Sequence, residues 1–193
     1  MSDRGVAYVA YGAAARREMQ ESARTLLEYH HLPVVTAPGM TGAETDRQKS
    51  RLSKTRLLDW APWEQVLYLD ADTRVYDGLL AGFGMLDDGW EMVLTPSANQ
   101  YDDWLWHVDA KEREDTRRAL GFEALVLQAG VMFVRRTAAV ERLFRVWQDE
   151  YRGGEDQAAL LRAYWENPVK VWLLGRPWNG GAVIGHLFGR TRQ

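Results

Sequence analysis

The segment "VLYLDADTRV", residues 66–75, runs four apolar residues into two aspartates separated by one alanine. Such a run predicts a buried β-strand that ends at Asp70. Two neighbouring carboxylates at a buried strand end cost free energy, through repulsion and through lost hydration. A divalent cation would offset this cost, because Mg²⁺ and Mn²⁺ accept oxygen ligands. We therefore expect a cation site at Asp70 and Asp72; the alternative is that Asp72 and Thr73 only begin a turn.

Apolar strands alternate with helical patterns along the rest of the chain. Valine-rich or leucine-rich runs predict strands at 5–12, 32–37, 91–97, 125–136 and 169–174. Helical patterns predict helices near 19–27, 48–60 and 140–151, with a short helix after residue 155, and the segment 99–118 is expected to be an aromatic loop that leads into a charged helix. The tail from 175 to 193 is glycine-rich and predicts a loop with a short strand. This alternation indicates an α/β fold with a mostly parallel central sheet covered by helices, in which ligands bind beyond the carboxyl ends of the strands.

The length and composition of the chain argue against several classes of protein. The 193 residues fit one domain, 1–193, and the mild net charge of -3 argues against a partner that is a nucleic acid. The chain has no cysteine, which excludes disulfides and thiolate zinc sites and suits a cytoplasmic location. We expect no signal peptide and no transmembrane segment, because no apolar window is long enough. The composition leaves the oligomeric state open.

A phosphohydrolase of the haloacid-dehalogenase type also uses an apolar strand that leads into D-x-D-x-T, which "DADT" fits. That chemistry requires a later lysine followed by an acidic cluster. After the motif the chain has only Lys111 and Lys170, and no acidic residue follows Lys170. Acidic residues do surround Lys111, but they lie mostly in a helix-like run of charged residues that is typical of a solvated surface. We therefore favour a different use of the two aspartates.

Several further segments occur in an order that resembles GT-A glycosyltransferases, in particular the glycogenin-like and lipopolysaccharide-galactosyltransferase-like retaining group. A lysine-bearing helix precedes the D-x-D strand in "RLSKTRLLDWAPWEQVLYLDADTRV". The later segments are "LQAGVMFVRR", similar to an N-x-G-V strand, "EDQAALLRAYW", similar to a D-Q helix, "WN", and "HLFGRTR", similar to an H-x-x-G-x-x-K tail. The resemblance covers nearly the whole chain and implies a single-domain, Rossmann-like GT-A fold.

The resemblance implies a metal site and a donor site. Asp70, Asp72 and His186 would hold Mn²⁺ or Mg²⁺ against the diphosphate of a nucleotide sugar, with a UDP-sugar as the expected donor. An isolated histidine is more often a satisfied core residue, and the flanking Gly185 and Gly189 favour the ligand interpretation. The residues that would bind the donor are Ala10, Tyr11, Gly12, Arg51, Lys54, Ala71, Gln128, Asn179, Gly189 and Arg192.

The residues expected near the reacting carbon are Asp156 and Gln157, with Lys54 approaching the donor. A solvated basic face is the alternative for Lys54 and Arg51, and a favourable carboxylate in a first helical turn is the alternative for Asp156. Several positions depart from the pattern. Gln128 stands where the group usually has Asn, Ala129 where Ser or Thr is common, and Arg192 where it has Lys, and the segment "GAAARRE" lacks the usual tyrosine.

The expected function is metal-dependent transfer of a sugar to an acceptor hydroxyl on a glycan, a protein or a small molecule, with retention of configuration. The sequence leaves open a front-face displacement and a double displacement through Asp156. Tyr101, Trp104 and Trp106 are candidates for an acceptor platform or for core packing. Alternative functions are a noncatalytic sugar-nucleotide sensor, a nucleotidyltransferase and the phosphohydrolase.

Overall fold

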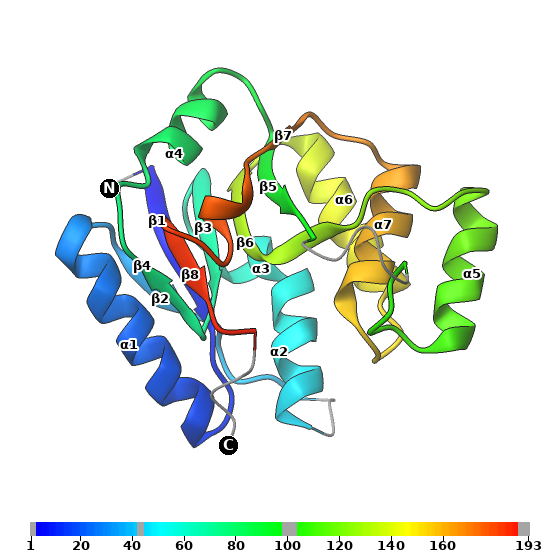
Figure 1. Cartoon of the computed structure of the whole chain (residues 1–193), viewed down its shortest axis with the longest axis horizontal. Coiled ribbons are helices and arrows are strands. Elements are labelled where there is room, and N and C mark those ends of the chain that lie inside the picture. Colours follow the sequence, from blue (N-terminus) through cyan, green and yellow to red (C-terminus); the bar gives the residue numbers. More distant parts are fainter. Residues whose placement is uncertain (1–2, 42–44, 98–103, 189–193) are drawn as a thin grey trace.

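A central β-sheet separates two layers of helices (Figure 1). The computed structural model describes residues 3–41, 45–97 and 104–188. The main sheet has the strand order β2-β1-β3-β6-β5-β7, and β4 pairs with β8 in a small second sheet. The strands are β1 (Arg4–Val9), β2 (Val34–Thr36), β3 (Gln65–Asp70), β4 (Thr73–Val75), β5 (Met92–Pro96), β6 (Leu127–Arg135), β7 (Val171–Leu173) and β8 (Ile184–His186).

The main sheet is mostly parallel, as the alternating pattern predicts. Strand β1 runs parallel to β2 and β3, and β5 runs parallel to β7, whereas β6 is antiparallel to both β3 and β5. The reversal of β6 matters for the site. It places the first residues of β6 beside the carboxyl end of β3, with Val131 opposite Leu69 and Gly130 next in line toward Asp70.

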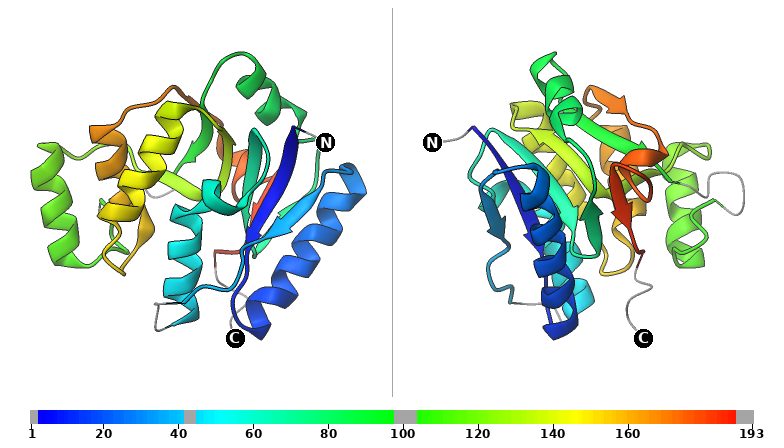
Figure 2. Two further views of the ribbon diagram at one scale, coloured as in Figure 1. Left: turned by 180° about the vertical axis from the view of Figure 1, so that it is seen from behind. Right: turned by 60° about the vertical axis from the view of Figure 1, so that its left-hand side comes forward.

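The helices cover both faces of the sheet. They are α1 (Ala13–Tyr29), α2 (Asp46–Thr55), α3 (Leu57–Trp60), α4 (Leu80–Asp87), α5 (Ala110–Leu120), α6 (Ala138–Glu150) and α7 (Asp156–Glu166), with a 3₁₀ turn at Arg176–Trp178. One core cluster joins the sheet to α3, α6 and α7, and a second joins the other face to α1 and α4. The rear view shows α6 and α7 on the side away from α1 (Figure 2). A third cluster lies between α5 and α7.

The alternation of side chains along the strands explains both cores. In β3, Val66 and Tyr68 belong to the first cluster while Leu67 and Leu69 belong to the second. A strand that is apolar at every position is therefore buried on both faces, which is the pattern of a helix-covered sheet. The helical prediction for 140–151 is confirmed by α6, whose Trp147 is fully buried.

Two elements differ from the sequence prediction. The helix expected at 48–60 is divided into α2 and α3, because Arg56 leaves helical geometry with φ -100° and ψ 17°. Helix α4 was not predicted, since "LAGFGMLD" contains two glycines, which are poor helix formers. Gly82 has a packing reason, because a Cβ there would lie 2.3 Å from the ring of Phe133. The glycine lets α4 approach β6 closely.

Candidate metal and donor site

The two aspartates lie at the turn between β3 and β4, and the second sheet brings His186 to them. Asp70 is the last residue of β3, and Asp72 lies in the turn that follows. Strand β8 pairs antiparallel with β4, with His186 opposite Thr73. The three residue pairs between β4 and β8 therefore hold His186, which is distant in sequence, beside the turn that contains the aspartates. Ala71, expected to contact the donor, lies between the aspartates and is half-buried.

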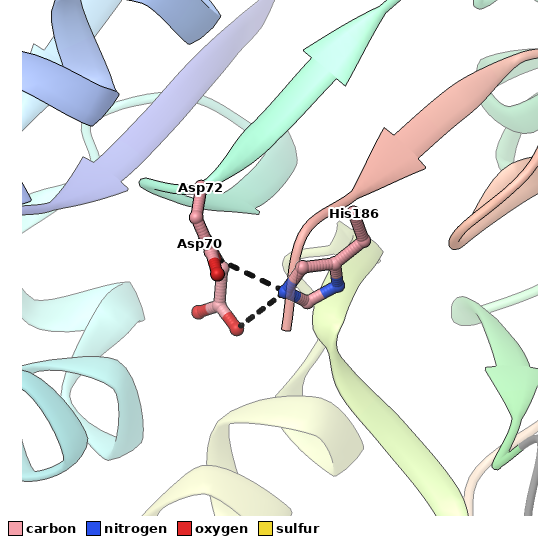
Figure 3. Close-up of side chains that lie close together, drawn as sticks. All are labelled: Asp70, Asp72 and His186. Atoms are coloured by element: carbon pink, nitrogen blue, oxygen red, sulfur yellow. Dashed lines mark ion pairs between the residues drawn. The ribbon is translucent and has the colours of Figure 1, made fainter. Parts of the chain in front are cut away.

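The three side chains point toward one another (Figure 3). His186 Nε2 lies 3.1 Å from Asp72 Oδ1 and 3.7 Å from Asp70 Oδ2. One potential ligand atom from each residue lies within 4.8 Å of the other two. Two carboxylates and one imidazole form a donor set suited to Mn²⁺, and the oxygen ligands also suit Mg²⁺. The chemistry of the three side chains fits the predicted cation.

Gly130 provides the space that this arrangement needs. A Cβ at position 130 would lie 2.5 Å from His186 Cε1 and 2.8 Å from Asp70 Oδ2. Any side chain there would push the histidine and the carboxylate apart. The glycine in "LQAGV" is thus a site residue that the sequence analysis did not single out, although it lies within a quoted motif.

Asn179 fixes the orientation of the histidine ring. Its Nδ2 donates to Thr95 Oγ1 at 3.0 Å, so its Oδ1 faces His186 Nδ1, at 2.7 Å. A carbonyl oxygen only accepts hydrogen bonds, so Nδ1 carries the proton. The lone pair of a neutral ring then lies on Nε2, the nitrogen that faces the two aspartates. Asn179 was expected to bind the donor; the structure places it, buried, behind the histidine.

We predict that Asn179→Leu weakens Mn²⁺ binding by about ten- to a hundredfold, because partners that orient a ligand histidine typically have effects of this size. Titration of Mn²⁺, followed by the electron paramagnetic resonance signal of the free ion, measures the change. Asn167→Leu is a matched control, since Asn167 follows α7 as its C-terminal cap. An Asn179→Leu protein with unchanged Mn²⁺ affinity would contradict the orienting role.

Lys54 is buried between two carboxylates. Its Nζ lies 2.9 Å from Asp156 Oδ2 and 3.2 Å from Asp70 Oδ1. Burial alone would lower the pKa of Lys54, but the charges of Asp156 and Asp70 outweigh it and raise that pKa. Burial would likewise raise the pKa of Asp156, and Lys54 and Arg51 reverse this and lower it. Both groups are therefore ionised at neutral pH.

Tyr68 completes the surroundings of Asp70. Its hydroxyl donates to Asp70 Oδ1 at 2.8 Å, and its ring lies 5.3 Å from Lys54 Nζ. Burial, and next the neighbouring Asp70, raise the pKa of Tyr68 well above its ordinary value, so the hydroxyl stays protonated. One oxygen of Asp70 is thus held by Lys54 and Tyr68, and the other faces His186. Tyr68 is not among the site residues that the sequence pattern predicts.

Arg51 lies on the same face of α2 as Lys54, as its spacing predicts. It forms an ion pair with Glu155, and its Nη1 donates to the carbonyl of Gly154 at 2.7 Å. These contacts tie α2 to the loop that leads into α7. Gln157, beside Asp156 at the start of α7, donates from Nε2 to the carbonyl of Leu127 at 3.2 Å and is buried.

The residues after β1 lie at the same end of the sheet. Ala10 follows β1, and Tyr11 donates to the carbonyl of Pro38 at 2.6 Å and contacts Ser53 Oγ at 2.8 Å. Gly12 begins α1 with φ +81°, and a Cβ there would lie 2.6 Å from Asp46 Oδ2. Tyr11 is half-buried there, whereas Tyr8 is buried in the core.

The remaining predicted residues lie in β6, in the segment before α5, or outside the described part of the chain. Gln128 is half-buried in β6, opposite Thr95. Trp104 is buried, and its indole N–H donates to the carbonyl of Ala124 at 2.8 Å, whereas Trp106 is exposed. Tyr101, Gly189 and Arg192 lie outside the described residues.

In comparisons by sequence, the chain matches no protein-family model and no curated protein. Solved structures that share its fold include the following three. A glycosyltransferase involved in the glycosylation of the major capsid of PBCV-1 has a TM-score of 0.65 at 12% identity, over 96% of this chain and 93% of that one. The bifunctional glycosyltransferase WbbM has a TM-score of 0.65 at 13% identity, over 93% of this chain but only 40% of that one. Mouse xyloside xylosyltransferase 1 has a TM-score of 0.58 at 13% identity, over 91% and 86%.

The chain therefore has a GT-A-like glycosyltransferase fold, and the α/β prediction with a mostly parallel, helix-covered sheet is confirmed. At these identities the likeness establishes the fold. None of the three neighbours is described as a phosphohydrolase or a nucleotidyltransferase, so the comparisons give those alternatives no support. Among the described residues, no helix has the length and apolar character needed to cross a membrane.

Proposed function

We propose that the protein is a metal-dependent glycosyltransferase that moves a sugar from a UDP-sugar to an acceptor hydroxyl, with retention of configuration. The observation that carries this proposal is the convergence of Asp70, Asp72 and His186 on a fold shared with glycosyltransferases. The acceptor is a glycan, a protein or a small molecule. In this proposal the protein belongs to the glycogenin-like group of retaining glycosyltransferases and acts in the cytoplasm. A chain without cysteine is compatible with that reducing compartment.

In this proposal the three ligands hold Mn²⁺ or Mg²⁺. The cation would supply neutralisation of the departing diphosphate, which favours breaking the sugar C–O bond. The residues of the chain supply fixed charges around that position. Lys54 keeps Asp156 ionised, and an ionised carboxylate held in a buried place stabilises positive charge that develops on a sugar ring.

The remaining donor contacts extend the proposal outward from the metal site. Tyr11, with Ala10 and Gly12, would flank the nucleotide base, and Ala71 and Gln128 would contact the ribose or the sugar. Gly189 and Arg192 would contact the diphosphate. Arginine can hold a phosphate with two parallel hydrogen bonds, so its presence in place of lysine is compatible with that role.

The proposal is tested by calorimetric titration of the protein with UDP, with Mn²⁺ present and with the metal chelated. We expect binding that depends on the metal, with an affinity at least about tenfold weaker after chelation, because the diphosphate would then lose its principal counter-charge. GDP provides a control for the base. Equal affinity with and without the metal would contradict a metal-dependent site.

A noncatalytic sugar-nucleotide sensor is the alternative from another class. The same protein incubated with UDP-glucose or UDP-galactose and Mn²⁺ distinguishes the two, because even without an acceptor a transferase slowly hydrolyses its donor. Release of UDP supports the enzyme. Tight donor binding with neither transfer nor hydrolysis, across several UDP-sugars, would support the sensor.

A further inference from the structure

Three buried hydroxyl groups form a continuous chain that ends at the cation site. Tyr8 Oη lies 3.1 Å from Ser22 Oγ, Ser22 Oγ lies 2.8 Å from Thr73 Oγ1, and Thr73 Oγ1 donates to the carbonyl of Asp70 at 2.9 Å. All three side chains are completely buried. The chain thus links β1 and α1 to the turn that carries Asp70 and Asp72.

The direction of donation along this chain follows from its last bond. The single hydroxyl proton of Thr73 is donated to the carbonyl of Asp70, so Ser22 must donate to Thr73. Ser22 then has no proton left for Tyr8, so Tyr8 must donate to Ser22. Burial raises the pKa of Tyr8 to about 12, although Ser22 and Arg74 oppose the shift, so the phenol remains a donor at neutral pH. Every hydroxyl has a single fixed direction.

Thr73 contacts the backbone of the whole ligand set. Its hydroxyl binds the carbonyl of Asp70, it directly follows Asp72, and it pairs with His186 in the β4–β8 ladder. The amide of Leu187, next to the histidine, donates to the carbonyl of Asp72 at 3.1 Å. Loss of the Thr73 hydroxyl would therefore remove a bond that holds the turn of Asp70 and Asp72, to which the β4–β8 ladder joins His186.

We propose that Thr73 is a positioning residue for the cation site, and that Ser22 and Tyr8 hold its hydroxyl in the productive direction. The proposal rests on the proposed function, because it takes Asp70, Asp72 and His186 as the ligands. It makes α1 part of the support of the site, although α1 contributes no ligand. Groups that position metal ligands in this way typically change metal affinity by ten- to a hundredfold when removed.

The test compares Thr73→Val with Thr25→Val in a titration with Mn²⁺ alone. Thr25 is a matched control, since its buried hydroxyl also joins α1 to β4, accepting from the amide of Val75 at 3.0 Å and donating to the carbonyl of Ser22 at 2.8 Å. Both variants lose buried hydrogen bonds and are expected to melt at lower temperature. Only Thr73→Val is expected to weaken Mn²⁺ binding, by about ten- to a hundredfold, and Thr73→Ser is expected to restore it.

Ser22→Ala is the second variant, should Thr73→Val fail to fold, because alanine suits a helix interior. It removes the donor to Thr73 and is expected to weaken Mn²⁺ binding severalfold. The positioning proposal is overturned if wild-type protein binds Mn²⁺ and the affinity is the same in Thr73→Val or Ser22→Ala, or falls equally in Thr25→Val. A wild-type protein that binds neither Mn²⁺ nor Mg²⁺ would overturn the proposed function itself, and the positioning role with it.

Discussion

Replacing Asp72 with asparagine is expected to lower the rate of sugar transfer by about a thousandfold and to abolish the dependence of UDP binding on Mn²⁺. A metal ion contributes several kcal/mol of charge stabilisation to such a reaction, and each 1.36 kcal/mol corresponds to a tenfold change in rate. Asparagine has nearly the same size as aspartate but lacks the negative charge, so the variant should fold. Steady-state transfer or donor hydrolysis, together with calorimetry, measures the effect.

Asp72 is a better target than Asp70 for this purpose. Asp70 also contacts Lys54 and Tyr68, so its replacement would disturb the buried charges as well as the metal. Asp88→Asn is the control, because this exposed aspartate follows α4 and lies outside the ligand set. We expect wild-type activity from it. An Asp72→Asn protein that still binds UDP in a metal-dependent manner would contradict the assignment of the ligands.

The fold was predictable from the sequence because its signals are local. The apolar run before Asp70, with side chains buried on both faces, is sufficient to indicate a helix-covered strand. The spacing of Val140, Leu143, Phe144 and Trp147 is sufficient to place α6. Helix α4 had no such signal. Its two glycines lower helix propensity, and the benefit of one of them, the close packing of Gly82 against Phe133, exists only once β6 is in place.

The site was predictable only in part, because its geometry depends on segments that are distant in sequence. The D-x-D spacing pointed to two ligands, and the resemblance to glycosyltransferases pointed to His186, which the structure brings within 3.1 Å of Asp72. The spacing of residues along the sequence does not reveal that Asn179 orients the ring of His186 by a hydrogen bond. Likewise, nothing local to "LQAGV" shows that Gly130 makes room for the ring.

Lys54 illustrates the same limit most clearly. On α2 alone, Lys54 and Arg51 form a basic face, which is compatible with solvent exposure or with binding of phosphates. The structure instead buries Lys54 between Asp70, from β3, and Asp156, from α7. Three elements must assemble before this interaction exists. It joins the strand that carries a candidate metal ligand to the helix that carries the proposed sugar-facing carboxylate.

Lys54→Met is expected to lower the free energy of unfolding by about 3–5 kcal/mol, because it leaves the buried carboxylate of Asp156 and the half-buried carboxylate of Asp70 without their shared cation. Lys49→Met is the control on the same helix. Lys49 pairs with Asp46 at 3.6 Å near the surface, so its loss should cost less than about 1 kcal/mol. Urea unfolding at neutral pH measures both. Equal stabilities for the two variants would contradict the buried charge arrangement.

The pH dependence of stability should change in the same variant. In the wild type the pKa of Asp156 is lowered below its unfolded value of about 3.9, so its stabilising contribution is present above that pH and is lost as the pH falls through the folded pKa. Without Lys54, burial acts unopposed by the lysine and raises the folded pKa. The cost of burying the ionised Asp156 carboxylate is then present at neutral pH, and it is relieved as this group is protonated at lower pH. The stability of Lys54→Met should therefore approach that of the wild type in acid. Added Mn²⁺ should also recover part of the loss at neutral pH, since a cation bound at Asp70 replaces some of the missing positive charge.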